Sequence, residues 1–206
     1  MLRAIVFFLI HSLFFVTVTA HANSMDELVK LLSFDAFKAS FQQITRDKQQ
    51  AELQKLDGVL QLQKPDRFFW QSVEPYPQQL ISNGKVIWHF DADLEQVVIQ
   101  EYAKQAERAP MMLVFRDGNA LAKTFNLIKT QQRQGLKVFE LEAKDAEASI
   151  RKVELGFKGE QLQRLRFVDH LQQTTDVNFS KVLLNQQSPA SQFEFIIPEG
   201  ADVLYE

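Results

Sequence analysis

Apolar and polar residues alternate along the chain between Gly58 and Ile99, a stretch that also holds both tryptophans, Trp70 and Trp88. Alternation with a period of two predicts antiparallel strands that bury one face. Turn signals interrupt the alternation at Lys64-Pro65, Glu74-Pro75, Asn83-Gly84 and Asp91-Ala92-Asp93. The Asn-Gly pair is the strongest of these signals, because it favours the two-residue turn of a β-hairpin. We therefore expect a series of strands here.

Similar alternation before and after this stretch extends the predicted sheet. We expect an extended run at 37–46 and strands at 52–63, 67–73, 78–82, 85–90, 94–100, 125–129, 138–143, 151–157, 165–167, 175–179 and 193–197. About ten or eleven short strands with one helical interruption predict a mainly β fold of the α+β class, built on a single curved antiparallel sheet.

Helical patterns occur in two places. Ser24 and Glu27 have the spacing of a capping box, and leucines follow at helical intervals, so residues 24–33 are predicted to form a short helix. The second place is the interruption, where good helix formers fill 101–108 and Pro110 can open another short helix at 111–115. We interpret 117–119 as a turn, followed by one helical turn at 120–123.

Residues 1–22 have the pattern of a secretory signal peptide. Arg3 supplies a positive charge, residues 5–16 are almost wholly apolar, and Ala20-His21-Ala22 matches a small-x-small cleavage site. A membrane anchor is the alternative, but the apolar run is short for a span. We expect residues 23–206 to form one domain. Because the chain has no cysteine, it has no disulfide and is not itself a lipoprotein; the expected location is the periplasm.

Composition and motifs argue against several classes of function. The formal net charge of −3 disfavours a nucleic-acid partner, which needs a basic face. The chain lacks a Gly-x-Ser-x-Gly elbow and a glycine-rich phosphate loop. Beyond residue 22 its histidines are His89 and His170, whose spacing matches no zinc signature. We therefore expect no enzyme, no metal and no cofactor, and interpret Asp91 and Asp93 as turn residues.

Phenylalanine is abundant, with 18 in the chain. A packed core would need these rings on the inner faces of strands. A curved sheet that is not filled by side chains would instead enclose an apolar cavity. Composition does not choose between the filled and the hollow interpretation.

A set of motifs resembles a known family. These motifs are Phe-x-Ala-Ser-Phe at 37–41, Lys-Pro…Phe-x-Trp at 64–70, Leu-Ile-Ser-Asn-Gly-Lys with a tryptophan at 80–88, Asp…Leu-Glu-Gln at 91–96, Pro-Met-Met-Leu at 110–113, and Phe-x-Phe with Pro-Glu-Gly at 193–200. Each is weak alone. Together they resemble the family of periplasmic outer-membrane lipoprotein carriers, LolA, over nearly all of residues 23–206.

The resemblance implies an incomplete eleven-stranded antiparallel barrel with a lid of short helices over a hydrophobic cavity. We expect the cavity to be lined by Leu60, Leu62, Phe68, Trp70, Trp88 and Phe90. Met111, Met112 and Leu113 would belong to the lid, where the flexibility of methionine suits variable acyl chains.

The resemblance also implies a function. A monomer would bind the acyl chains of lipoproteins released by the inner-membrane ABC transporter LolCDE and deliver them to the outer-membrane receptor LolB. Lys64 stands where the family has an arginine that holds the lid shut, and Gln61 stands where it has a tryptophan. Because lysine lacks the planar fork of arginine, the first change is not conservative. A LolA-like binding protein for a glycolipid, a lipidic pigment or a fatty acid is the alternative, and a lipid-sensing domain is a third hypothesis.

Overall fold

The computed structural model describes residues 20–102, 114–116 and 118–206. Its helices and strands are α1 (Ala20–Leu31), β1 (Ala36–Arg46), β2 (Glu52–Gln63), β3 (Arg67–Glu74), β4 (Gln78–Asn83), β5 (Val86–Asp91), β6 (Gln96–Glu101), α4 (Gly118–Thr124), β7 (Phe125–Arg133), β8 (Leu136–Ala143), β9 (Ile150–Lys158), β10 (Gln161–Asp169), β11 (Thr174–Leu184), the 3₁₀ helix η1 (Ala190–Phe193) and β12 (Asp202–Tyr205). The prediction of a mainly β fold is confirmed.

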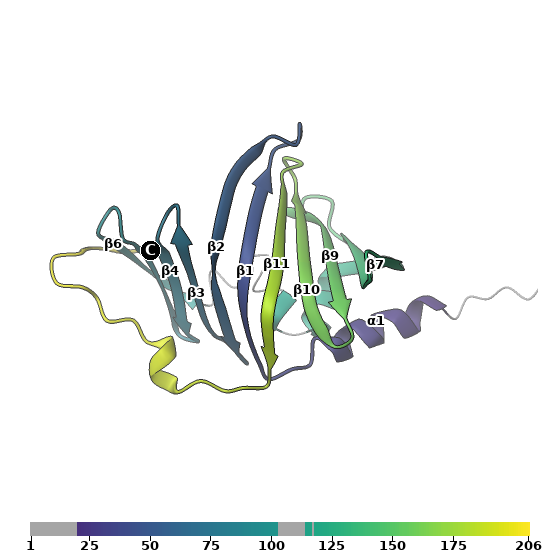
Figure 1. Cartoon of the computed structure of the whole chain (residues 1–206), viewed down its shortest axis with the longest axis horizontal. Helices are drawn as coiled ribbons and strands as arrows, with labels where there is room; N and C mark the ends of the chain where they lie inside the picture. Colours follow the sequence, from purple (N-terminus) through teal and green to yellow (C-terminus); the bar gives the residue numbers. More distant parts are fainter. Residues whose placement is uncertain (1–19, 103–113, 117) are drawn as a thin grey trace, which may run out of the picture.

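All of these strands belong to one sheet, in the order β12-β6-β5-β4-β3-β2-β1-β11-β10-β9-β8-β7. Neighbouring strands are antiparallel except β12, which runs parallel to β6. The sheet curves but does not close on itself, because β12 and β7 are its two free edges (Figure 1). This arrangement agrees with the expected incomplete barrel, with one strand added at the β6 edge.

The strand register defines two faces in the β2–β6 half of the sheet, since directly paired residues point to the same side. The inner face carries the row Leu60, Trp70, Leu80 and His89. The outer face carries the row Gln61, Phe69, Ile81, Trp88 and Ile99. Both rows contain large apolar side chains, so both faces must be covered.

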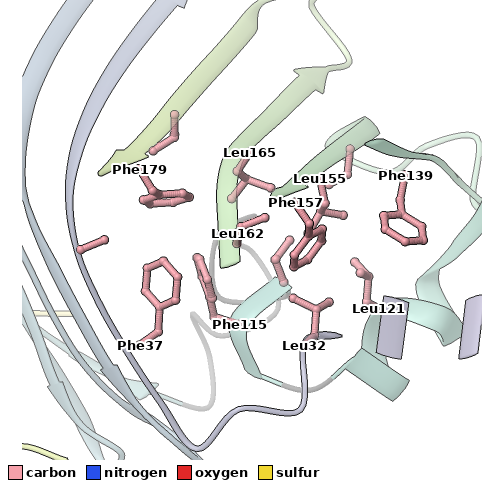
Figure 2. Close-up of a cluster of buried hydrophobic side chains, with 14 of the residues drawn as sticks. Leu32, Phe37, Phe115, Leu121, Phe139, Leu155, Phe157, Leu162, Leu165 and Phe179 are labelled. Atoms are coloured by element: carbon pink, nitrogen blue, oxygen red, sulfur yellow. The ribbon is translucent and has the colours of Figure 1, made fainter. Parts of the chain in front are cut away.

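The core fills the inner face of the other half, from β1 through β11 to β7. Figure 2 shows phenylalanine and leucine side chains from these strands meeting Leu32, Phe115 and Leu121 from the helical segments. Helix α1 packs against α4 and β7 rather than across β3–β6. A β-carbon on Gly118 would lie 3.0 Å from the Val29 Cα atom, so a glycine here lets α4 approach α1 closely.

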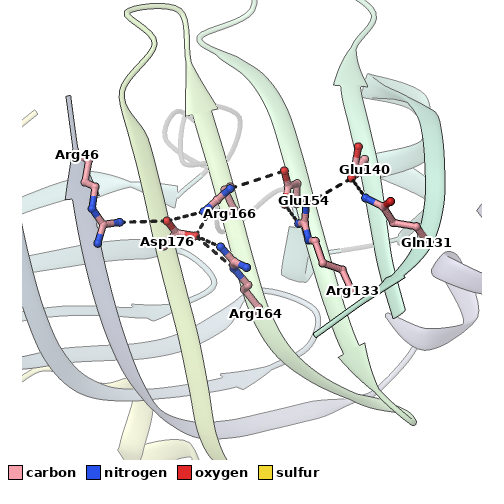
Figure 3. A network of polar contacts seen from close by, with 8 residues as sticks. All are labelled: Arg46, Gln131, Arg133, Glu140, Glu154, Arg164, Arg166 and Asp176. Atoms are coloured by element: carbon pink, nitrogen blue, oxygen red, sulfur yellow. Dashed lines mark hydrogen bonds and ion pairs between the residues drawn. The ribbon is translucent and has the colours of Figure 1, made fainter. Parts of the chain in front are cut away.

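A charged row crosses the outer face over β1, β11, β10, β9 and β8 (Figure 3). Its centre is the carboxylate of Asp176, which is buried and accepts hydrogen bonds from Arg46, Arg164 and Arg166. Burial alone would raise the pKa of Asp176, but the hydrogen bonds from Arg166 and Arg164 outweigh it and hold that pKa below its usual value. The row continues through Glu154, which pairs with Arg166.

Three sequence predictions differ from the structure at helix and strand ends. Helix α1 begins at Ala20, so Ser24 lies inside it and is not its N-cap; the preceding alanines favour the longer helix. Residues 194–197 are not a strand. The alternating rings of Phe193 and Phe195 reflect separate contacts, because Phe193 is buried at the end of η1 and Phe195 packs on Phe90. Strand β12 was not predicted although a turn at Glu199-Gly200 precedes it, because four residues are too few to show a clear alternation.

The helical interruption is described only in part. Residues 114–116 are helical, and α4 confirms the helical turn predicted at 120–123. Gly118 and Asn119 were expected in a turn but belong to α4. The helix predicted at 101–108, and most of the helix at 111–115, lie outside the described residues.

Candidate functional site

A cavity of about 200 Å³ opens on the inner face where β2, β3 and β4 meet residues 102 and 115–116. Its apolar wall consists of Leu60, Leu62, Phe68, Trp70, Leu80, Tyr102 and Phe115. Polar groups from Gln43, Gln63, Lys64, Asp66, Arg67 and Arg116 also border it. The chemistry of this arrangement suits an amphiphile, with the apolar wall for a hydrocarbon chain and the polar groups for its head.

One close contact shapes the wall. The rings of Phe41 and Trp70 stack with their centroids 5.5 Å apart, across the strand that carries Gly58. A β-carbon on Gly58 would lie 2.6 Å from the Phe41 ring and 2.0 Å from the Gln71 carbonyl oxygen. Only a residue without a side chain lets the Phe41 ring lie flat here and support Trp70.

Four residues expected in the cavity lie together in its wall: Leu60, Leu62, Phe68 and Trp70. Trp88 and Phe90 do not line it, which corrects that expectation. In β5 the side chains that share the inner face with Trp70 are Ile87 and His89, so Trp88 and Phe90 point outward. The Phe90 ring packs on Phe195 instead, with centroids 5.4 Å apart. The predicted alternation is present. Because β5 has apolar side chains on both faces, the alternation alone did not indicate which face of β5 points inward.

Lys64 joins the β2–β3 turn to the end of α1. Its ammonium group donates a hydrogen bond to the Leu32 carbonyl oxygen (2.5 Å) and lies 4.8 Å from the centre of the Phe34 ring. Its backbone N–H donates to the Asp35 carbonyl oxygen at 2.9 Å. The last carbonyls of a helix have no partner within the helix, and a cation near them is favourable. Lys64 therefore bonds to the backbone just after the end of α1.

The cavity also contains residues that the sequence analysis did not single out. Tyr102 and Arg116 both approach Asp66: the Tyr102 hydroxyl donates to Asp66 Oδ1 at 2.7 Å, and Arg116 Nε lies 3.9 Å from the same oxygen. Burial raises the pKa of Tyr102, and the neighbouring Asp66 raises it further. Asp66 directly follows the Lys64-Pro65 turn signal, and no pattern in the sequence links it to Tyr102 or Arg116.

The remaining expectations concern the lid residues, the histidines, metal binding and a membrane span. Met111, Met112 and Leu113 lie outside the described residues. Among the described residues no three histidine, cysteine or acidic side chains come together in a metal-binding group. His89 lies on the inner face, paired with Leu80 and Val98, whereas His170 is exposed. In the same part of the chain, no helix combines the length and the apolar character needed to cross a bilayer.

Comparison with known proteins places these features in a context. The family model described as "Outer membrane lipoprotein carrier protein LolA" matches residues 33–196. A protein from Methylobacillus flagellatus named outer-membrane lipoprotein carrier protein is 33% identical over 174 residues, which is 84% of each chain. A protein of the same name from Pseudomonas fluorescens is 32% identical over 193 residues, covering 92% of this chain and 93% of the relative.

A solved structure shares the fold. An uncharacterized conserved protein from Thermus thermophilus superimposes with a TM-score of 0.54, covering 90% of this chain and 99% of its own. Its sequence is 13% identical to this chain, so the likeness concerns the architecture alone.

Proposed function

This chain belongs to the LolA family of outer-membrane lipoprotein carrier proteins, and on that premise we propose that it carries lipoproteins through the periplasm. The cargo would be lipoproteins released from the inner membrane, held by their acyl chains and delivered to the outer membrane. The observation that carries this proposal is the inner-face cavity, whose wall combines Leu60, Phe68 and Trp70.

The energetics explain why a carrier is needed. Each methylene group buried away from water is worth about 0.8 kcal/mol, so three long acyl chains exposed to water would cost tens of kcal/mol. A protein that offers an apolar wall removes most of this cost during transit. It must also give the cargo up, so the loaded and empty states must lie within a few kcal/mol of each other.

The cavity volume fits an empty state. Its volume of about 200 Å³ is smaller than the roughly 300–1,000 Å³ of typical small-ligand sites. Loading therefore requires the wall to move apart. The bond between Lys64 and the Leu32 carbonyl is a suitable point of control, because it ties the cavity rim to the end of α1. We propose that Met111, Met112 and Leu113 belong to the lid over the cavity.

Partners and location follow from the same premise. We propose that the chain receives cargo from the inner-membrane transporter LolCDE and passes it to the receptor LolB, acting as a monomer. Residues 1–22 serve as a signal peptide, and residues 23–206 are the working carrier domain. No chemical step is involved, so the protein is not an enzyme.

The alternative function is the binding of another amphiphile, a glycolipid, lipidic pigment or fatty acid. The observation that favours it is Lys64 in place of the family's arginine.

The second difference from the family is Gln61, whose side chain accepts a hydrogen bond from the Ser188 hydroxyl at 2.9 Å on the outer face. An indole has no acceptor for this hydroxyl, so the glutamine at 61 gives β2 a contact with the C-terminal segment that a tryptophan would not make.

The deciding experiment measures release of radiolabelled lipoprotein from inner-membrane vesicles that contain the transporter. Wild-type protein should bring the lipoprotein into solution, and Phe68→Glu should not transfer it onward, because a carboxylate in the wall is costly to bury beside acyl chains. Val59→Glu is the matched control, since Val59 lies on the outer face of β2 and is partly exposed. Failure of the wild-type protein, together with a different lipid found by native mass spectrometry, would support the alternative.

A further inference from the structure

Asp66 lies two residues after Lys64 in the β2–β3 turn but contacts a different part of the cavity. Its Oδ1 atom accepts the Tyr102 hydroxyl hydrogen bond at 2.7 Å and lies 3.9 Å from Arg116 Nε. Tyr102 follows the end of β6, and Arg116 follows Phe115. The carboxylate thus links two segments that are 14 positions apart in the chain to the turn between β2 and β3.

The hydrogen bond from Tyr102 is made by a mostly buried residue. Tyr102 is 7% exposed, and a buried hydroxyl without a partner is destabilising. Its acceptor is ionised, which makes the bond stronger than one between neutral groups. Gly84, at φ +90°, leaves room for Asp66, because a β-carbon on Gly84 would lie 3.3 Å from the Asp66 Cβ atom.

Both linked segments are anchored on their far sides. The Tyr102 backbone N–H donates to the Lys85 carbonyl oxygen at 3.0 Å. The Phe115 ring packs on Phe37, with 5.3 Å between centroids, and Phe115 is buried in the core. Asp66 is therefore a contact that joins two anchored parts of the cavity lining.

We propose that Asp66 is a positioning residue that holds Tyr102 and Arg116 together in the cavity lining and so slows the exit of a bound acyl chain. The proposal rests on the proposed function only in requiring that the cargo contains a hydrocarbon chain. It is separate from the contact of Lys64, which reaches the end of α1. The role is steric and electrostatic, and no bond is made to the cargo.

The test measures exit of 11-(dansylamino)undecanoic acid from the full-length mature protein after mixing with excess unlabelled fatty acid. Asp66→Ala and Tyr102→Phe should each speed exit by about tenfold, the lower end of the scale expected for losing a hydrogen bond to a charged group. The double variant should be no faster than Asp66→Ala, because both changes remove the same contact. Asp66→Asn keeps an acceptor for Tyr102 and should have a smaller effect.

Matched controls remove the same groups elsewhere. Asp93→Asn changes an exposed turn carboxylate, and Tyr205→Phe removes the hydroxyl of a tyrosine that is 77% exposed. Both should leave exit unchanged. Tyr102→Phe keeps the ring, so it should fold with an unchanged cavity wall, and its thermal midpoint checks this.

Two outcomes would overturn the inference: exit rates of Asp66→Ala and Tyr102→Phe equal to that of wild type, or a wild-type protein that binds no probe. Failure of the proposed function looks different. In that case the wild-type protein binds the dansyl probe and the variants release it faster, but lipoprotein stays in the vesicles.

Discussion

At the scale of single residues, Gly58 shows how one missing side chain builds part of the cavity. The Phe41 ring covers it, and Trp70 stacks on Phe41. Strands β2 and β3 are also closest here, since a β-carbon on Gly58 would be 2.0 Å from the Gln71 carbonyl oxygen. The backbone at Gly58 has no positive φ, so the requirement for glycine is one of space alone.

Gly58→Ala should therefore destabilise the protein more than an ordinary overpacking change. We expect a loss of about 3 kcal/mol, because the neighbouring atom is backbone and cannot rotate away. Urea unfolding followed by tryptophan fluorescence measures it. Gly156→Ala is the matched control: its β-carbon would meet the end of the Leu136 side chain at 3.0 Å, which can move. Equal losses in the two variants would contradict this explanation.

Lys64 allows a second prediction at this scale. Lys64→Arg offers additional donors in a planar fork to the carbonyls near the end of α1, so exit of the dansyl fatty acid should slow. Lys64→Met keeps the side-chain stem but loses the bond to the Leu32 carbonyl, and exit should become about tenfold faster. Lys55→Met, at an exposed position of β2, should have no effect. If Lys64→Arg and Lys64→Met both release the probe at the wild-type rate, Lys64 does not control exit from the cavity.

At the scale of elements, the charged row on the outer face holds β1, β11 and β10 together. Asp176→Asn leaves Arg164 and Arg166 without their carboxylate, and it should lower the free energy of unfolding at pH 7 by about 2 kcal/mol. This is less than for a fully buried pair, because the side chains of these arginines are 21% and 30% exposed. Glu52→Gln, at an exposed end of β2, is the control and should change little.

The same carboxylate gives a pH dependence. Because the folded pKa of Asp176 lies below its usual value of 3.8, its contribution is fully present above about pH 4 and is lost as the pH falls through the folded pKa. Wild-type stability should therefore fall on acidification from pH 4, and the fall should be shallower in Asp176→Asn. Urea midpoints at pH 6, 4 and 3 test this, and parallel acid limbs would contradict it.

Elements also show how far the sequence could lead. Strands β2 to β6 were predicted nearly to the residue, because alternation and turn signals are local. The side on which Trp88 and Phe90 lie was not predictable, because the outer face of β5 is also apolar. Phe195 of the C-terminal segment packs on Phe90 there, a contact that only the fold creates. The cluster of Tyr102, Asp66 and Arg116 depends on segments that only the fold brings together.

At the scale of the whole molecule, the sheet is divided into two halves with different tasks. One half consists of β1, β11, β10, β9, β8 and β7. It buries its inner face under α1 and α4 and supplies the stable core. The half from β2 to β6 leaves part of its inner face as a cavity. The segment after β11 contacts its outer face: Asn83 donates to Glu194, and Phe195 packs on Phe90. Strand β12 of the same segment extends the sheet by pairing with β6. The C-terminal segment thus supports the strands that carry the cavity wall from the opposite side and from the β6 edge.

This two-faced arrangement puts the two tryptophans in opposite environments, and the difference can be measured. Trp70 lines the cavity, whereas Trp88 points to the outer face. A fatty acid brominated along its chain quenches tryptophan only on contact, so it should strongly quench Trp88→Phe, in which Trp70 remains. It should hardly affect Trp70→Phe, in which Trp88 remains, once unequal binding is corrected by titration with the dansyl probe. Equal quenching of both variants at equal occupancy would mean that acyl chains do not choose the inner face, and the cavity would lose its role.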